Sequence, residues 1–508
     1  MRYVGEHMSH NCAMVRATVG VLAAVLVLPL AQGCTPPGAR GAAGMKEYPA
    51  ATPLPIPALA QGTFRNGRTV IPLRIRTGRT DFGQPGGPAD TLGINGSYLG
   101  PTIRLHRGEQ VRAVVHNTLD EMTTLHWHGL HVPAKSDGGP HSMIDPGQTW
   151  RPEWTVRQPA ATLWYHSHPH GQTAQQVYRG VAGMLILDDP GAVDVGLPSD
   201  YGVDDVPLIV QDKSFAADGQ LIVDPEPVQG PSTGFLGDTI VTNGRIGTYF
   251  PVTTQAVRLR LLNASNARAY NFGFDDDRTF DIVASDGGLL AAGVPAKRVQ
   301  LSPGERAEIV VRMQPGETVH LNSTPPDLGT GADARYSGGT FNVLELRAAP
   351  TLRPSPTIAA ALTDLPPPDP AAARTTREFR IQGRAINGRP MQMARIDFAV
   401  PVNSYEIWEV SNQDRQPHNF HVHNVQFRIL TRGADPPPPE LAGYKDTMYV
   451  APQTTARILV RFTDYTDRNW PYMFHCHLLL HEDLGVMGQF VVVKPGQSAG
   501  HPPHDMPM

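Results

Sequence analysis

Apolar and polar residues alternate with a period of two in many short runs along the chain. Examples are Val-Arg-Ala-Val-Val at 111–115, Val-Arg-Leu-Arg-Leu-Leu at 257–262 and Tyr-Glu-Ile-Trp-Glu-Val at 405–410. This period is typical of strands that bury one face. The chain also contains 50 glycines and 49 prolines, which are turn residues. The pattern therefore predicts an all-β protein with many loops.

The strand-like runs belong to a pattern that recurs with a spacing near 145 residues. An Asn-Gly pair, beginning at Asn95, Asn243 and Asn387, precedes each run, and a polar turn containing asparagine follows it. A repeat of this length predicts three copies of one β-sandwich domain. The expected organisation is a signal peptide over 1–34, a tether over 35–61, domains over 62–190, 200–349 and 376–495, a proline-rich connector over 350–375 and a tail over 496–508.

The N-terminus has the features of an export signal. An apolar run at 17–31 follows Arg16 and is too short to span a membrane comfortably. The Ala-Gln-Gly-Cys that ends at Cys34 resembles the cleavage site of bacterial lipoproteins. We therefore expect an exported protein, periplasmic or in the cell envelope, with a lipid anchor at Cys34; export without an anchor is the alternative. A net charge of −4 gives no electrostatic argument for a nucleic-acid partner.

Cysteine usage points to a metal. The three cysteines are Cys12, Cys34 and Cys476, so the body of the exported protein keeps a single thiol and no internal disulfide. A lone thiol outside the cytoplasm is open to oxidation. A bond to a metal ion would explain why it is there.

The segment around Cys476 reads His475-Cys476-His477, with His481 five residues after the cysteine. If this segment is extended, Cys476 points to one face while His475 and His477 point to the other. A thiolate with imidazoles is the ligand set of a blue-copper electron-transfer site. The flanking imidazoles suggest an electron path from that site into a second, histidine-bound cluster. Structural zinc is the alternative, but such sites are usually richer in closely spaced cysteines.

The other histidines strengthen this interpretation. Twenty histidines placed at random would give roughly 0.8 His-x-His pairs, whereas the chain has five. Four pairs lie in the first and third predicted domains: His126 and His128, His166 and His168, His421 and His423, His475 and His477. If those domains pack together, eight imidazoles could surround a multinuclear cluster. His418, Cys476 and His481 remain as a separate three-ligand site.

Together these motifs resemble those of the three-domain multicopper oxidases. Their sequences are most similar to the motifs of the bacterial laccases and cuprous oxidases. The resemblance rests on His-Trp-His-Gly, His-x-His, His-x-x-His-x-His and His-Cys-His-x-x-x-His-Glu-Asp, and it covers nearly all of 62–495. It implies cupredoxin-like Greek-key sandwiches that hold four copper ions. It also implies four one-electron oxidations of substrate coupled to reduction of dioxygen to two waters.

The resemblance implies a role for each ligand. These are type 1 copper for His418, Cys476 and His481; type 2 copper for His126 and His421; and the type 3 pair for His128, His166, His168, His423, His475 and His477. Glu482 and Asp137 stand where similar enzymes have acids that deliver protons. A structural loop role is the alternative for both acids. Asp414 stands where cuprous oxidases have an acidic substrate-site residue.

The chain departs from the family pattern beside the thiolate. Many members have an axial methionine ten residues after the cysteine, where this chain has Val486. Val486 would then face the copper without donating, and the reduction potential should be higher than with a thioether. A one-residue bulge that brings Met487 to the copper is the alternative.

The substrate is less constrained by the sequence. The chain lacks the methionine-rich insertion of cuprous oxidases, and Met391 and Met393 fit core or pocket positions better than ion ligands. We therefore expect a laccase-type enzyme, a monomer, acting on phenols or aromatic amines, with oxidation of Cu(I) or another metal ion as the alternative. A copper nitrite reductase would not need all eight cluster histidines. A copper-free scaffold, as in some cell-division proteins similar to this family, predicts eroded ligands, but all eleven ligand positions are filled.

Overall fold

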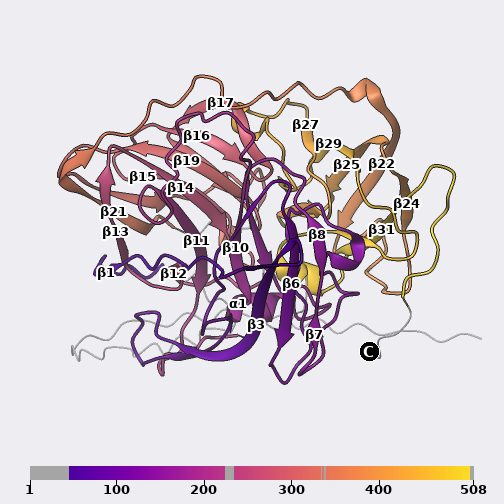
Figure 1. Cartoon of the computed structure of the whole chain (residues 1–508), viewed down its shortest axis with the longest axis horizontal. Coiled ribbons are helices and arrows are strands. Elements are labelled where there is room, and N and C mark those ends of the chain that lie inside the picture. The colour runs from indigo at the N-terminus through magenta and orange to yellow at the C-terminus, as the bar shows by residue number, and fades with distance from the viewer. Residues whose placement is uncertain (1–44, 224–233, 333, 337–338, 504–508) are drawn as a thin grey trace, which may run out of the picture. The chain divides into compact units, whose positions relative to one another are not determined.

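The computed structural model describes residues 45–503, except 224–233, 333 and 337–338. The predicted signal peptide and Cys34 lie outside the described residues. Strands dominate the described chain, which confirms the all-β prediction, and they form six sheets that group into three pairs along the sequence (Figure 1). No helix in these residues is long and apolar enough to cross a membrane.

The first pair of sheets is built from the region of the first two histidine motifs. One sheet has the order β2-β3-β6-β7, with β4 and β8 at its edges, and the other has the order β5-β10-β9. The elements are β2 (Thr63–Arg65), β3 (Arg68–Thr80), β4 (Ala89–Ile94), β5 (Ile103–His106), β6 (Gln110–Asn117), η1 (Ala134–Ser136), β7 (Thr149–Trp150), β8 (Glu153–Thr155), β9 (Ala161–His166), α1 (Thr173–Arg179) and β10 (Ala182–Asp188).

The second pair forms the middle of the chain. Its sheets have the orders β1-β13-β21-β20-β15-β18 and β12-β11-β14-β19-β16-β17. The elements are β1 (Thr52–Pro53), β11 (Asp205–Lys213), β12 (Thr239–Thr242), β13 (Thr248–Thr254), β14 (Ala256–Asn263), β15 (Tyr270–Phe274), β16 (Phe280–Ser285), β17 (Gly288–Ala296), β18 (Arg298–Leu301), β19 (Arg306–Arg312), β20 (Thr318–Ser323), η2 (Ala334–Tyr336) and β21 (Phe341–Arg353).

The third pair carries the cysteine. Its sheets have the orders β23-β22-β25-β29-β27 and β24-β31-β30-β26-β28. The elements are η3 (Pro370–Ala372), β22 (Ala373–Gln382), β23 (Ala385–Ile386), β24 (Phe398–Pro401), β25 (Tyr405–Asn412), β26 (His418–Val422), β27 (Arg428–Arg432), η4 (Pro439–Leu441), β28 (Thr447–Val450), β29 (Thr455–Arg461), β30 (Tyr472–His475), α2 (Leu479–Asp483) and β31 (Met487–Val493).

The repeated asparagines perform the same task in each sandwich. Asn95, Asn243 and Asn387 all have positive φ, of 61°, 49° and 55°, which asparagine tolerates better than most residues. Each side-chain Oδ1 accepts the backbone N–H of a strand residue, at 2.7, 2.8 and 2.8 Å respectively. Each Nδ2 donates to a backbone carbonyl of the same strand. The sequence repeat is therefore a structural repeat.

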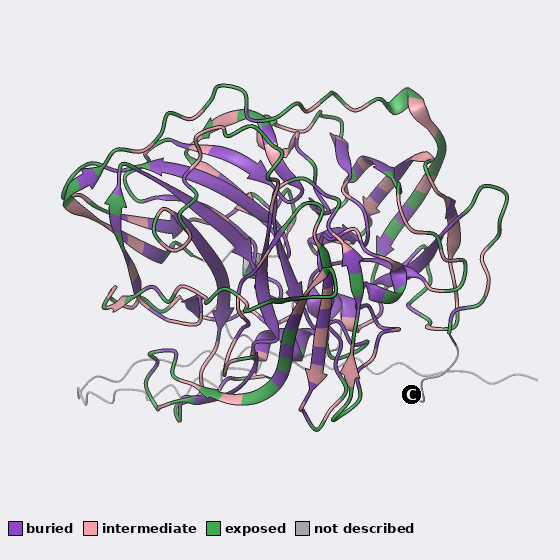
Figure 2. Ribbon diagram, viewed as in Figure 1, coloured by how far each residue is buried: buried purple, intermediate pink, exposed green. Residues whose placement is uncertain are grey.

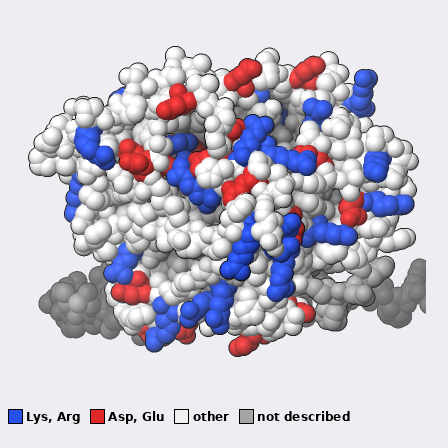
Figure 3. Space-filling model, in the orientation of Figure 1, with Lys and Arg blue, Asp and Glu red and all other residues white. Residues whose placement is uncertain are grey.

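Each sandwich buries its own apolar core between its two sheets. The interior strand positions are buried, whereas connecting loops and sheet edges are mostly exposed (Figure 2). Basic and acidic side chains are interspersed on the face shown in Figure 3. The three sandwiches therefore have separate apolar cores.

The C-terminal half of the predicted tether packs against the middle sandwich. β1 pairs in parallel with β13, and Leu54 joins the middle core. Lys46 forms an ion pair with Asp238, with Nζ 2.9 Å from a carboxylate oxygen. Residues 45–61 therefore do not behave as a free linker, because apolar and polar contacts fix them along this segment.

The two short α-helices join the first and third sandwiches. Asp483, at the end of α2, accepts the backbone N–H groups of Thr173 and Ala174 at the start of α1, both at 2.9 Å. A carboxylate at a helix N-terminus satisfies donors that the helix itself leaves unpaired. This contact holds together the two regions that carry the histidine pairs.

Candidate metal centres

The first centre brings one thiol and two imidazoles together. His418 begins β26, Cys476 follows β30, and His481 lies in α2. Cys476 Sγ is 3.3 Å from His418 Nδ1 and 3.6 Å from His481 Nδ1, and the two nitrogens are 3.2 Å apart. An ion at the middle of this triangle would lie about 2 Å from each donor, close to metal–imidazole and metal–thiolate bond lengths. The structure thus brings the three predicted residues together.

The electrostatics of this centre favour a thiolate. Burial alone would raise the pKa of Cys476, but the neighbouring His418 and His481 lower it to about 5. Burial lowers the pKa of His418, yet Cys476 and Asp414 together raise it to about 9. A thiolate held against imidazoles is a soft, electron-rich ligand set that suits copper in both oxidation states.

The second centre is a pocket lined by imidazoles from the first and third sandwiches. Its eight histidines are at most 1% exposed. His126 stacks on His423, with ring centroids 3.9 Å apart, and His128 stacks on His421 at 3.7 Å. Each contact pairs a ring from one sandwich with a ring from the other. The prediction that these pairs surround one cluster thus agrees with the geometry.

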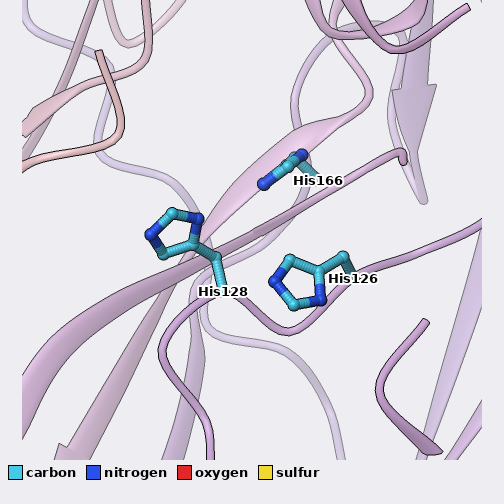
Figure 4. Close-up of side chains that lie close together, drawn as sticks. All are labelled: His126, His128 and His166. Atoms are coloured by element: carbon cyan, nitrogen blue, oxygen red, sulfur yellow. The ribbon is translucent and has the colours of Figure 1, made fainter. Parts of the chain in front are cut away.

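Two groups of three rings stand out within the pocket. His475 Nε2 lies 3.2 Å from the Nε2 atoms of both His168 and His423. A second group consists of the rings of His128, His166 and His477, whose centroids are 4.9 to 5.6 Å apart. His126 and His128 lie beside His166 with their rings turned toward a common space (Figure 4). Each group could hold one ion.

Hydrogen bonds on the outer side of the rings fix which nitrogen faces the pocket. The Nδ1 atoms of His126, His166 and His421 lie 2.8, 2.8 and 2.9 Å from backbone carbonyl oxygens. A carbonyl can only accept, so Nδ1 carries the proton and Nε2 keeps its lone pair. Burial lowers the pKa of His166 to about 3, which keeps that lone pair free.

The free lone pairs test whether metal ions fit the pocket. Among the described residues, the Nε2 atoms of His126, His166 and His421 and both ring nitrogens of His477 are buried without a hydrogen-bond partner. An unsatisfied buried polar atom costs about 1–3 kcal/mol, so several in one pocket would be destabilising. A metal ion would satisfy one nitrogen of each of these rings. The donor set, imidazole only, suits copper and fits the group that the resemblance implies.

The two predicted acids contact the pocket directly. Asp137 Oδ2 is 2.7 Å from His423 Nδ1. The two carboxylate oxygens of Glu482 each lie 3.2 Å from a ring, that of His168 and that of His475, and one accepts the Thr173 hydroxyl at 2.7 Å. Burial and the nearby Asp483 raise the pKa of Glu482 well above its usual value. Burial therefore favours the protonated form of Glu482.

The third predicted acid lies at the thiolate centre. Asp414 Oδ2 is 3.1 Å from His418 Nε2, on the side away from Cys476. A small pocket there is lined by Gly383, Arg384, Asp414, Gln416, His418, His481, Leu484 and Val486. Val486 thus lies beside the ligands. Met487 instead pairs with His475 across β30 and β31 and packs with other methionines, so no bulge brings it to the thiolate.

Sequence reasoning missed Asp446 and Arg306. Asp446 precedes β28 and is fully buried; one carboxylate oxygen lies 2.9 Å from His128 Nε2, and its backbone carbonyl accepts His421 Nδ1–H. Arg306, from the middle sandwich, donates to both carboxylate oxygens at 2.7 and 2.6 Å. The middle sandwich therefore supports the pocket although it supplies no ligand. Asp446, in an isolated Asp-Thr pair, and Arg306, within a strand, belong to no sequence motif. The sequence alone therefore gave no signal for either residue.

The fold and the two centres together define a copper-dependent oxidase architecture. Family models described as multicopper oxidase match residues 77–192 and 364–496. The "Multicopper oxidase mco" of Staphylococcus haemolyticus (strain JCSC1435) is 34% identical over 440 residues, covering 84% of this chain and 90% of that protein. The chain belongs to the multicopper oxidase family.

Two further relatives show how broad this family is. The "Cell division protein FtsP" of Escherichia coli (strain K12) is 36% identical over 449 residues, covering 87% of this chain and 92% of that protein. The solved structure of a laccase-like multi-copper oxidase CueO from Ochrobactrum sp. matches with a TM-score of 0.78 and 37% identity, covering 87% of this chain and all of that one.

Proposed function

We propose that the protein is a laccase-type oxidase that couples one-electron oxidation of phenols or aromatic amines to the four-electron reduction of dioxygen to water. The observation that carries this proposal is the segment 475–477. Cys476 lies in the thiolate centre, while its direct neighbours His475 and His477 lie in the histidine pocket. Two covalently continuous branches therefore connect the centres, which is what repeated single-electron transfer requires.

The ligand roles follow from this arrangement and the family. His418, Cys476 and His481 would hold type 1 copper. His126 and His421 would hold type 2 copper. The type 3 pair would be held by His168, His423 and His475 on one ion and by His128, His166 and His477 on the other. Four bound copper ions supply reversible one-electron storage and a place for dioxygen.

The chain itself would move protons. Glu482 contacts His168 and His475, and Asp137 contacts His423, so both acids reach the same side of the pocket. Reduction of dioxygen to two waters consumes four protons, and water has little access to a pocket whose histidines are at most 1% exposed. The raised pKa of Glu482 favours its protonated form, which is the form that can donate. Asp137 also accepts from His423 and would help orient that ring.

The substrate proposal rests on Asp414 beside His418, because the pocket there, of about 10 Å³, has room only for a small group. Asp414 could accept the hydroxyl proton of a phenol within hydrogen-bond reach of a type 1 ligand. None of the residues that line this pocket in the described part of the chain is a methionine or cysteine, so its donors do not suit capture of Cu(I). The Ochrobactrum relative is described as active towards lignin model compounds and lignosulfonate. Oxidation of Cu(I) or another metal ion is the second candidate, since Asp414 could also bind a cation.

A purely structural function is a third candidate, because similar proteins include one named for cell division. Such a function would not require eleven buried residues of the copper-ligand type gathered in two groups. The signal-like leader leads us to propose export to the periplasm or cell envelope, with Cys34 as a lipid anchor. Cell fractionation of wild type and Cys34→Ala would test the anchor: release from the membrane fraction supports it.

The deciding experiment compares dioxygen uptake by copper-loaded protein with a phenol and with Cu(I) as reductants. Intense blue absorption and faster uptake with the phenol would support the laccase-type function. The same absorption with uptake only on Cu(I) would favour the metal oxidase. Absence of both absorption and uptake in protein that holds copper would contradict an enzymatic function.

A further inference from the structure

Four methionines gather beside the histidine pocket but belong to neither metal centre. Met391, Met473 and Met487 are buried and form a cluster of their own, and the partly buried Met393 packs against it. The described residues contain ten methionines in all. Four in one cluster, drawn from three segments of chain, is a marked concentration of thioethers. We call these four residues the methionine cluster.

One side of the methionine cluster adjoins the pocket. Met487 is the direct cross-strand partner of His475, and Met473 lies two residues before His475 on the same strand face. A Cβ placed on Gly139 would lie 3.6 Å from Met473 Cγ and 3.9 Å from His423 Cε1. Met473 and the ring of His423 therefore both lie close to Gly139. The cluster borders the side of the pocket that His423 and His475 form.

The other side of the cluster leads to solvent. A surface pocket of about 410 Å³ has Met487 in its wall, together with Asp397 and Arg395. The loop that carries Met391 and Met393 closes over the cluster, and Gln489 holds it there by donating to the carbonyls of Met393 and Arg395 at 2.9 and 2.6 Å. Met487 therefore lies between this surface pocket and His475 of the histidine pocket.

Thioethers select soft, monovalent ions. Methionine sulfur binds Cu(I) well and competes poorly for Cu(II) or zinc, which imidazole and carboxylate prefer. A flexible thioether can also release an ion to a stronger imidazole set nearby. The pocket histidines are at most 1% exposed, so copper that reaches them must pass through protein. A chain of weak, soft ligands would supply that passage.

We propose that the methionine cluster is a Cu(I)-binding site that passes copper to the histidine pocket during loading of the enzyme. The ion would bind to the thioethers near Met487 and move to imidazole nitrogens of His475 and His423 as Cu(I), with no change in oxidation state. The delivery step rests on the proposed copper ligation of the pocket. Binding of a soft ion by the thioethers does not depend on that proposed copper ligation.

The first test uses Ag(I), a soft monovalent ion, as the probe of copper-loaded protein, whose other centres are already filled. Native mass spectrometry counts bound silver in wild type, in Met391→Leu with Met487→Leu, and in the matched control Met184→Leu with Met448→Leu. Leucine conserves volume, so both variants should fold. Met184 and Met448 are buried in other cores. We expect the cluster variant to hold one silver ion fewer than wild type and the control to match wild type. Equal counts in all three proteins would overturn the proposal.

The second test measures delivery. Copper-free protein is supplied with Cu(I) without oxygen, or with Cu(II), and copper content is followed over time. We expect the cluster variant to load roughly tenfold more slowly from Cu(I) but at the wild-type rate from Cu(II), because thioethers discriminate between the two ions. Loss of the silver ion with unchanged Cu(I) loading would overturn delivery. Protein whose histidine pocket never takes up copper would instead contradict the proposed function, whatever the silver count.

Discussion

The two candidate metal centres of this protein are built in contrasting ways. The thiolate centre takes its ligands from one sandwich, within residues 418–481, and β26, β30 and α2 position them. The histidine pocket takes four rings from the first sandwich and four from the third. The second sandwich supports it through Arg306, which donates to Asp446 of the third sandwich. A centre inside one domain should survive disturbance of domain contacts. A centre between domains should be disrupted when the domain contacts are disturbed.

The same contrast appears in the environment of the ligands. The thiolate centre carries charge, because Cys476, His418 and Asp414 influence one another's pKa. In the pocket, burial holds the pKa of His126, His128, His168, His421, His475 and His477 well below the usual value. One centre is suited to exchanging an electron with a substrate, and the other to holding several ions away from water.

Removal of the thiolate should separate the two centres most sharply. We expect Cys476→Ser to abolish the blue absorption and to slow turnover by on the order of 100-fold or more, since substrate electrons lose their point of arrival. Copper content should fall by about one ion of four, because the pocket ligands lie on other faces. Electron paramagnetic resonance for type 2 copper checks that the pocket stays loaded. Full activity in the variant would contradict the proposed electron path.

Glu482→Gln and Asp137→Asn should slow the pocket chemistry and spare the thiolate centre. We expect retained blue absorption and turnover slower by about 10²-fold, the usual contribution of one general acid. The control is Asp120→Asn, because Asp120 is an exposed acid in the same sandwich as Asp137. Stopped-flow reoxidation of the reduced enzyme measures the step directly. Unchanged rates would remove these acids from proton delivery.

The pH dependence follows from the raised pKa of Glu482. An acid whose pKa is raised stays protonated to a higher pH, donates below that pKa and loses its proton above it. Turnover of wild type should therefore fall as pH rises through that range. Glu482→Gln, which cannot ionise, should lack this decline. A decline that persists in Glu482→Gln would assign it to another group.

Loss of the ion pair between Asp446 and Arg306 should weaken metal binding by the histidine pocket but not by the thiolate centre. Asp446→Asn removes the carboxylate charge that Arg306 contacts through two nitrogens and leaves Asp286 as its remaining acidic neighbour, and loss of one member of a buried pair costs up to about 3–5 kcal/mol. We expect a lower thermal midpoint and pocket copper affinity reduced about 10–100-fold, as for other residues that orient metal ligands. Asp90→Asn removes an exposed ion pair with Arg79 and should cost less than about 1 kcal/mol. Equal loss of type 1 copper would show that the two centres are not independent.

The smallest effect should come from the residue beside the thiolate. Val486→Met offers the type 1 ion a thioether that stabilises Cu(II), so the reduction potential should fall. We expect less than about a tenfold loss of turnover, because the ligands themselves remain. Met487→Leu is the matched control and should leave the potential unchanged, since Met487 faces the methionine cluster. Redox titration of the two variants and wild type measures these reduction potentials. A shift in the control but not in Val486→Met would reverse the assignment.

Much of this molecule could be predicted from local sequence. Alternation with period two gave the strands, the Asn-Gly repeat gave three sandwiches, and His-x-His spacing placed paired rings on one strand face. These features could be found because they depend on neighbours a few residues apart. The C-terminal half of the tether could not be placed, because its pairing with β13 joins segments nearly 200 residues apart.

The sequence by itself determined the ligand set: one thiolate and the paired imidazoles that its chemistry needs. Only the tertiary structure decided which rings meet, as in the stacking of His126 on His423 and of His128 on His421. It alone joined Asp446 to Arg306 and gathered four scattered methionines beside the pocket. The physical reason is that ligand type and spacing are local properties of the chain. Contacts between domains depend on how whole apolar surfaces pack, and no short stretch of sequence encodes that.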